Sequence, residues 1–541
     1  MNDYIKKYGN ILSIIGLLAL CFLVYFLNIG NYPLMDVDET RYVSMAKDMF
    51  QTKDFMTLYL NGEYFFEKPP LYFWSECLSF WVFGGVSEFS ARFPGALYGT
   101  LVTFLVYYTG KKVVSHRFGL ISSLILTTFV EFGMLARYAI LDIVLTTMVG
   151  ISVLFGFLTQ FVDNKNKKYF WWLFYIFSGL AVLAKGLPGF IIPFGAMFCV
   201  SIFNKTFKQI FKPLYIIPGI ILFLLIVLPW HILMFNLHDP LFFNEYIMKH
   251  HVNRFFSSSV IDRKEPFYFY IVTLLWGALP YTLSIISVGI EKLMERAKIN
   301  FSDMSDSRKF LWFNIISLGF TLLFFSASST KLITYILPLY LFFAYIIGYV
   351  WDEYIFENKH THFINLSVYI MGAIFILASI VACFTKCFLP AQLYLDILSA
   401  KWFCITLLFL TGVLSILFAI KKKPLWVFLT YVSLIAIVSG FGTETFYEID
   451  YKFGQNDLIR FAVSSKIKDD KLYVINNPRK YSVLYYGGRV TYISMLNLPP
   501  AIFSNKSKTI IKTKDLKKLA KYHKFDIIKQ GMKYSLIQMK K

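Results

Sequence analysis

The sequence predicts an all-α polytopic membrane protein with a small α/β soluble domain at its C-terminal end. Three observations predict this fold class. Hydrophobic residues form 57% of the 541 residues and charged residues only 16%, whereas a soluble domain carries about 25% charged residues. Apolar runs near the ~20 residues that cross a bilayer recur throughout residues 1–442. Residues 443–541 lack such runs and read as a separate domain.

About thirteen membrane-spanning helices are expected from these apolar runs. They fall near residues 11–29, 91–110, 118–133, 139–160, 170–184, 187–204, 214–236, 268–289, 310–327, 332–350, 364–385, 402–420 and 424–442. No small-residue cleavage site follows the first run, so we expect it to be an anchor and not a removed signal peptide. The six cysteines show no metal or redox spacing.

The net charge of +21 is concentrated in short connections between the expected spans. Basic residues occupy every second connection, which is the positive-inside pattern and makes those loops and the N-terminus cytoplasmic. An odd number of spans then places the long loop 30–90 and the domain 443–541 outside. The basic residues are Lys6, Lys7, Lys111, Lys112, Arg117, Lys165, Lys167, Lys168, Lys205, Lys208, Lys212, Lys292, Arg296, Lys298, Arg308, Lys309 and Lys421 to Lys423.

The loop 30–90 contains two notable segments. After Asp38, residues 40–50 place Val43, Ala46, Met49 and Phe50 on one face, which predicts an amphipathic helix in the membrane interface. The segment FFEKPPLYF follows at residues 65–73. This segment places a Glu-Lys pair before two prolines and among aromatic residues, which indicates a binding site.

The domain 443–541 is expected to hold short strands at 471–476, 482–486, 489–494, 525–529 and 533–538, with a basic helix at 513–522. Nothing in it resembles a catalytic motif. We therefore interpret it as a lid or docking module.

Charged residues beside the apolar runs gather on the outer side once this topology is applied. A charge at membrane depth costs at least ~2.5 kcal/mol, so such residues usually mark a site. Lysine and arginine stabilise phosphate oxygens, and neighbouring carboxylates suit sugar chemistry. The combination predicts glycosyl transfer from a lipid phosphate. The residues are Asp36, Asp38, Glu39, Arg41, Glu67, Lys68, Arg137, Asp142, Lys185, His250, His251, Arg254 and Lys331.

The segments MDVDETRYVSMAKDMF, FMTLYLNGEYFFEKPPLYFW and VSEFSARFPGAL resemble the lipid A aminoarabinose transferases. These form a branch of the protein O-mannosyltransferase superfamily, whose membrane fold is called GT-C. The resemblance continues through ARYAILDIVL, LAKGLPGF, KHHVNRFF and KLITYILP, so it covers roughly residues 10–345 in motif order, and it is weaker beyond residue 350. It departs from the family at Phe65, where members often have Tyr, and Tyr64 would have to replace that hydroxyl.

The resemblance implies roles for individual residues. It places catalytic functions on Asp38, Glu39, Asp142 and Tyr335. It assigns the donor phosphate to cationic side chains, namely Lys68, Arg137, Lys185, Arg254 and Lys331. No cofactor is required by this reading, although Glu67 and His251 are suitable ligand types for a divalent metal.

The implied activity is transfer of an amino sugar from a polyprenyl-phosphate carrier to a phosphate of lipid A, at the outer face of a bacterial inner membrane. The sequence does not decide whether the sugar is 4-amino-4-deoxy-arabinose or a relative such as galactosamine. Two alternatives remain. One is a protein O-mannosyltransferase acting on Ser/Thr with Asp38 as base, and the other is a lipid-linked sugar transporter, although no internal repeat of the transporter kind is visible. Nucleic acid is not expected as a partner.

Overall fold

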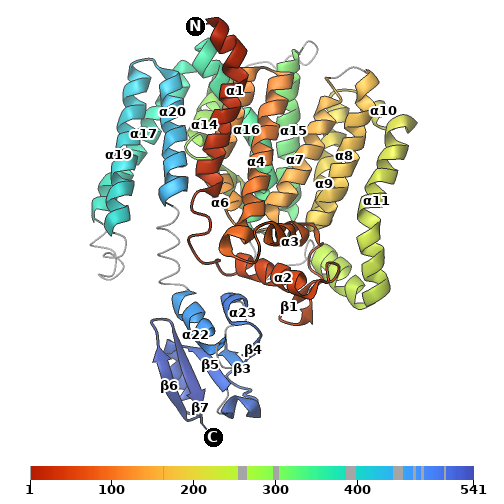
Figure 1. The fold of residues 1–541 in the computed structure, drawn as a ribbon. Coiled ribbons are helices and arrows are strands. Elements are labelled where there is room, and N and C mark those ends of the chain that lie inside the picture. Colours follow the sequence, from red (N-terminus) through yellow and green to blue (C-terminus); the bar gives the residue numbers. More distant parts are fainter. Residues whose placement is uncertain are drawn as a thin grey trace.

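The computed structural model describes residues 2–161, 164–253, 265–295, 304–384, 398–442, 455–466, 471–476, 480–504 and 507–540. Figure 1 shows a bundle of long helices, two helices lying across one end of it, and a small sheet-containing domain beneath them. The N-terminus lies at the opposite end of the bundle. The expected fold class is therefore confirmed.

Each expected membrane segment falls on a helix or on a bent pair of helices. In the described residues, seven helices are long and apolar enough to cross a membrane, or up to nine if each bent pair is one span. The seven are Gly9–Phe26 (within α1 Asn2–Cys21 and η1 Phe22–Phe26), α11 (Pro213–His238), α15 (Asp306–Ala327), Ile333–Glu357 (η3 Ile333–Ile336 and α16 Leu337–Glu357), α17 (Thr361–Cys383), Lys401–Ile420 (within α19 Leu398–Ile420) and Pro424–Gly442 (α20 Pro424–Ile437 and η5 Val438–Gly442).

The other expected segments are helical but bent, shorter or more polar. The bent pairs are α5 (His116–Thr127) with α6 (Val130–Ala136), and α13 (Phe269–Gly277) with α14 (Thr282–Met294). The shorter apolar helices are α7 (Asp142–Leu158) and α9 (Pro188–Phe203). The remaining two are α4 (Glu88–Val113) and α8 (Asn164–Lys185), and a single turn, α10 (Phe207–Ile210), follows α9.

The break between α8 and α9 determines where Lys185 lies. Lys185 is the last residue of α8. Gly186 has a φ of +78°, a conformation that costs glycine little and other residues more. Pro188 then begins α9, in a position where its missing N–H is no loss. The chain therefore reverses sharply here, and the lysine stands at a helix end.

The expected interfacial helix is present as α2 (Asp38–Thr52), and α3 (Leu71–Val82) follows it. Val43, Ala46 and Met49 are buried, as the sequence pattern predicts. They belong to the hydrophobic core shared with the bundle, so this apolar face packs on protein. Between the two helices, β1 (Tyr59–Leu60) and β2 (Glu63–Tyr64) form a small hairpin.

The C-terminal region contains a five-stranded mixed sheet with the order β4-β3-β5-β7-β6. Its strands are β3 (Lys471–Ile475), β4 (Val490–Ile493), β5 (Ser507–Lys512), β6 (Phe525–Gln530) and β7 (Tyr534–Met539), and its helices are α22 (Asn456–Lys466), α23 (Ser482–Gly487) and α24 (Leu516–Leu519). Two 3₁₀ turns, Pro500–Phe503 and Thr513–Asp515, complete it. Four of the five expected strands are present.

The structure differs from the expectation in this region at three elements. The expected strand at 482–486 is helix α23, where Val483, Leu484 and Tyr485 are buried, because packing decides the conformation of such β-prone residues. The strand β5 was not expected, because lysines flank its short buried run, Thr509 to Ile511, and make the segment look polar in the sequence. The expected helix at 513–522 is reduced to a 3₁₀ turn and α24.

Candidate active site

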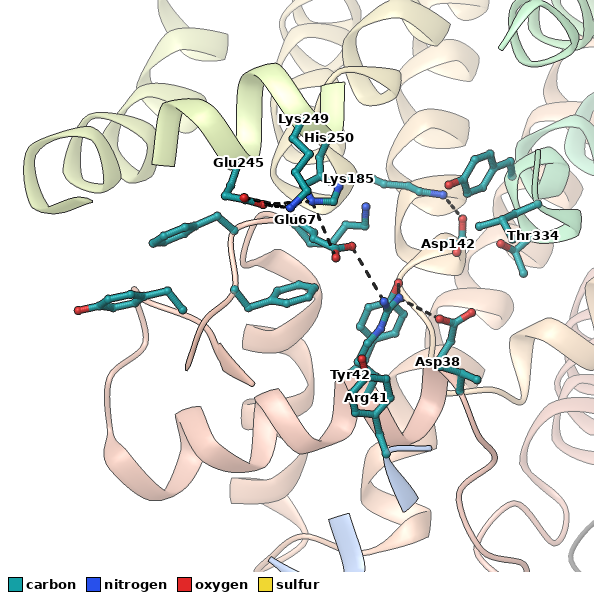
Figure 2. A pocket seen from close by; sticks show the side chains of 18 of the residues that line it. Asp38, Arg41, Tyr42, Glu67, Asp142, Lys185, Glu245, Lys249, His250 and Thr334 are labelled. Atoms are coloured by element: carbon teal, nitrogen blue, oxygen red, sulfur yellow. Dashed lines mark hydrogen bonds and ion pairs between the residues drawn. The ribbon is translucent and has the colours of Figure 1, made fainter. Parts of the chain in front are cut away.

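A cavity of 480 Å³ lies between the α2–α3 segment, the bundle and the C-terminal region. Its lining brings together residues that are far apart in the sequence. They are Val37, Asp38, Arg41, Tyr42, Tyr64, Phe65, Phe66, Glu67, Lys68, Asp142, Lys185, Leu241, Glu245, Lys249, His250, Leu332, Thr334, Tyr335 and Tyr481. Figure 2 shows several of these side chains facing one another across the cavity.

The first turn of α2 supplies one group of charges. Arg41 Nη2 donates to Asp38 Oδ1 at 2.9 Å, and Arg41 Nη1 lies 4.0 Å from Glu67 Oε2. Burial opposes the charge of Arg41, but Tyr42, Asp38 and Glu67 together raise the pKa of its guanidinium. Arg41 therefore stays positive between two carboxylates.

A second pair comes from the ends of two bundle helices. Lys185 Nζ, at the end of α8, is ion-paired with Asp142 Oδ1, at the start of α7. Both side chains are at least nine-tenths buried. Lys185 Nζ also lies 4.0 Å from the centroid of the Tyr335 ring, a geometry that stabilises a cation. The ammonium group is thus held in one place by a carboxylate and an aromatic face.

The Glu-Lys-Pro-Pro segment reaches the cavity where α11 ends. Lys68 is buried and lines the cavity. Glu67 lies between Arg41 and His250, with its Oε1 3.9 Å from His250 Nε2 (Figure 2). His250 belongs to the π-helical segment η2 (Phe243–Asn253) together with Glu245 and Lys249, whose side chains are joined at 2.7 Å.

A smaller apolar groove adjoins the cavity. Glu67, Lys68, Lys185, His250 and Tyr335 line both spaces. The rest of the groove is mostly apolar, formed by Leu187, Pro188, Phe324, Phe325 and Ser328. The charged cavity therefore adjoins a mostly apolar groove.

Six of the eleven residues chosen from the sequence for catalysis, phosphate or metal sites line the cavity: Asp38, Glu67, Lys68, Asp142, Lys185 and Tyr335. The side chain of His251 and the whole of Arg254 lie outside the described residues. Within the described ranges, no three His, Cys, Asp or Glu side chains are grouped so that they would hold a metal ion.

Three expected site residues lie elsewhere. Glu39 is buried and accepts hydrogen bonds from Arg92 and from the backbone N–H groups of Met35 and Ala139. Arg137 is fully buried and donates to the carbonyls of Val24 and Leu27.

Lys331 donates to the carbonyl of Ser328 at 2.8 Å and does not line the cavity. In these positions the three side chains bond to backbone groups and do not line the cavity, and their expected roles in catalysis and phosphate binding stay predictions. Thr334 and Tyr335, from the segment that follows Lys331, face the cavity instead.

Several lining residues were not chosen from the sequence. Of the adjacent His250 and His251, only His251 was chosen as a metal ligand, and sequence order alone does not tell which of two adjacent histidines faces a site. Glu245 and Lys249 carry the i,i+4 signal of a helical ion pair, which points to a helix but not to a cavity. No sequence signal indicates Tyr481, because its place depends on the docking of a distant region.

Comparisons with known proteins show which families and folds this chain resembles. Residues 10–242 match the family model of dolichyl-phosphate-mannose-protein mannosyltransferases. A protein of Aquifex aeolicus is 28% identical over 359 residues, 66% of this chain and 67% of that protein. The undecaprenyl phosphate-alpha-4-amino-4-deoxy-L-arabinose arabinosyl transferase of Yersinia pestis is 30% identical over 328 residues, 60% of this chain and 56% of the relative. The match thus spans little more than half the length of the Yersinia protein.

The crystal structure of ArnT from Cupriavidus metallidurans bound to undecaprenyl phosphate superimposes with a TM-score of 0.79. The superposition covers 97% of both chains at 18% sequence identity. The apo structure of the same protein gives the same TM-score. At this identity the likeness establishes the fold, which extends over the C-terminal region as well as the helical bundle.

Proposed function

We propose that this chain is a member of the protein O-mannosyltransferase superfamily of GT-C glycosyltransferases, which its match to that family model over residues 10–242 supports, and that it transfers an amino sugar from a polyprenyl-phosphate carrier to a phosphate of lipid A. The sugar is 4-amino-4-deoxy-arabinose or a relative such as galactosamine. The observation that carries the proposal is the junction of a cavity holding Lys68, Lys185 and Arg41 with an apolar groove.

This junction supports the following position for the donor. Its polyprenyl chain lies in the groove formed by Leu187, Pro188, Phe324 and Phe325. Its phosphate then meets Lys68 and Lys185, which line both spaces. Ammonium groups stabilise phosphate oxygens, and more strongly in a site shielded from water. Asp142 and Tyr335 position Lys185 for this contact.

The reaction exchanges one phosphate for another at the anomeric carbon. An oxygen of the acceptor phosphate forms the new bond to that carbon, while the bond to the carrier phosphate breaks and its electron pair leaves with the carrier. The acceptor phosphate has a second pKa near 6 and is largely dianionic at pH 7, so no strong general base is needed. Charge neutralisation and positioning of two phosphates that repel each other supply the catalysis.

Asp38 and Arg41 act on the side of the cavity away from the groove. Their 2.9 Å ion pair places a cation beside a carboxylate, and Glu67 approaches the same guanidinium. We assign Arg41 to the acceptor phosphate and Asp38 to the sugar. A divalent metal held by Glu67 and His251 remains a prediction, and among the described side chains His250 Nε2 lies 3.9 Å from Glu67 Oε1.

The membrane orientation follows from the loop charges. The basic connections and the N-terminus face the cytoplasm, and the cavity with the C-terminal domain faces the periplasm, at the outer surface of the bacterial inner membrane. In Figure 1 the N-terminus and the α2–α3 segment indeed lie at opposite ends of the bundle.

The proposal is tested by incubating the purified protein with undecaprenyl-phosphate aminoarabinose and lipid A. The expected products are free undecaprenyl phosphate and lipid A with an added sugar. Transfer to a Ser/Thr peptide in place of lipid A would support the mannosyltransferase alternative. Movement of the intact donor across vesicles, with no product formed, would support the transporter alternative.

Removing an aromatic side chain from the wall of the groove should weaken binding of the polyprenyl chain of the donor. Phe324→Ala removes apolar surface worth about 1.5–3 kcal/mol when buried, and we expect the KM for a long-chain donor to rise about tenfold. The KM for a donor with a short prenyl chain should change little. The control is Leu323→Ala, because Leu323 is 61% exposed and lies outside the groove. Equal KM changes for the two donors would contradict the placement.

A further inference from the structure

The C-terminal region contributes a side chain to the cavity. Tyr481 stands immediately before α23 and, among the described residues after residue 335, is the one that lines the cavity. It therefore comes from the small α/β domain, whereas the other lining residues come from the bundle and its α2–α3 segment. A module read from the sequence as a lid or docking unit thus forms part of the wall.

Hydrogen bonds fix Tyr481 beside the start of α2. Asp36, whose side chain is fully enclosed, accepts hydrogen bonds from Ser482 N at 2.8 Å and from Ser482 Oγ at 2.7 Å. Lys480 Nζ lies 3.8 Å from the same carboxylate. Because Ser482 follows Tyr481 and Asp36 comes two residues before Asp38, these bonds hold Tyr481 close to the charged end of α2.

Further hydrogen bonds join the same face of the C-terminal domain to the N-terminal part of the chain. Asn61 exchanges two hydrogen bonds with the backbone of Val490, at 2.7 and 3.1 Å. Lys47 Nζ donates to the carbonyl of Tyr485 at 3.0 Å. The hydroxyl of Tyr486 accepts from Leu34 N at 3.0 Å and donates to Glu88 at 2.8 Å. The position of Tyr481 is therefore set by contacts on several sides of α23.

Tyr481 lies on the side of the cavity that is away from the apolar groove. It lines the same cavity as Arg41. Tyr481, Asp38 and Arg41 line the charged cavity but not the adjoining apolar groove. If the donor chain fills the groove, this side is left for the second substrate.

We propose that Tyr481 is an acceptor-binding residue, whose hydroxyl donates a hydrogen bond to the acceptor phosphate next to Arg41. This inference rests on the proposed function and deepens it. The C-terminal domain completes the acceptor subsite, so that a phosphorylated lipid is bound between α2 and the segment Lys480 to Ser482. The donor phosphate is held without this domain, by Lys68 and Lys185.

The test is steady-state kinetics of the full-length Tyr481→Phe protein, with lipid A and undecaprenyl-phosphate aminoarabinose varied in turn. Loss of a hydrogen bond to a charged group should raise the KM for lipid A about tenfold. The KM for the donor should stay within about twofold of the wild-type value, because Tyr481 does not line the groove. The phenyl ring is kept, so the melting temperature should not change.

The matched control is Tyr492→Phe. The hydroxyl of Tyr492 donates to the carbonyl of Lys480 at 3.2 Å but does not line the cavity, so both KM values should stay unchanged. An unchanged KM for lipid A in active Tyr481→Phe protein, or an equal rise of KM for both substrates, would overturn this inference and leave the proposed function standing. Absence of transfer by the wild-type protein would instead contradict the proposed function and the inference with it.

Discussion

Replacing Lys68 with Met is expected to lower kcat/KM for sugar transfer by about 100- to 1000-fold, the range seen when one preorganised charge-stabilising group is removed. Lys68 lines both the charged cavity and the apolar groove, at the point where we propose that the carrier phosphate binds. Methionine keeps the apolar stem of the lysine and removes only the charge. The melting temperature in detergent should therefore stay near the wild-type value while transfer, measured by release of free carrier, is lost.

The matched control for this change is Lys53→Met. Lys53 follows α2 in the same outer segment, lies outside the charged cavity and has its Nζ 4.2 Å from the centroid of the Phe50 ring. Its replacement should leave transfer unchanged. Lys68→Arg keeps the charge and should recover part of the activity. Full activity in folded Lys68→Met protein would remove Lys68 from the phosphate site.

Glu39→Ala is expected to destabilise the protein by about 3–5 kcal/mol, the usual effect of breaking a buried ion pair. Arg92 donates to Glu39 through Nε at 2.9 Å and Nη2 at 2.8 Å, and exposed fractions of the two side chains are 0% and 1%. Without the carboxylate, the guanidinium of Arg92 is left buried and uncompensated. A large fall in the melting temperature of the purified protein checks this prediction.

Asp48→Ala provides the comparison for Glu39. Asp48 is an acidic residue on the same helix, but it is only partly buried and lies outside the cavity, so its loss should change stability by less than about 0.5 kcal/mol. A Glu39→Gln protein that melts like the wild type but transfers no sugar would contradict the structural role. It would return Glu39 to the catalytic residues.

The sequence was sufficient to predict the membrane bundle and most of the charged cavity. Apolar runs and alternating basic loops depend on the bilayer itself, so they indicate spans and orientation without any knowledge of packing. Lys185 and Asp142 were recognisable for a related reason, because a charge beside an apolar run is costly unless it has a purpose. Both stand at helix ends that face the same cavity.

The sequence was not sufficient to separate adjacent residues on a helix. Asp38 and Glu39 begin α2 one after the other, and successive helical side chains point about 100° apart. One carboxylate therefore reaches the cavity while the other turns inward to Arg92. The same ambiguity made His251, and not His250, the expected ligand.

Long-range docking was also beyond the sequence. Ser482 and Asp36 are separated by 446 positions, and no local pattern indicates that they meet. The helix α23 was expected as a strand for a similar reason. Its buried face is determined by contacts with α22 and α2, which outweigh the strand preference of Val483 and its neighbours.

The central claim is that this protein adds a sugar to a lipid A phosphate, and mass spectrometry of lipid A tests it most directly. Lipid A is compared from cells with the intact gene, from a deletion strain and from a strain carrying Asp38→Asn. We predict a sugar on a phosphate in the first sample, absent from the other two, with a mass that identifies the sugar. Identical lipid A in all three strains would contradict the account.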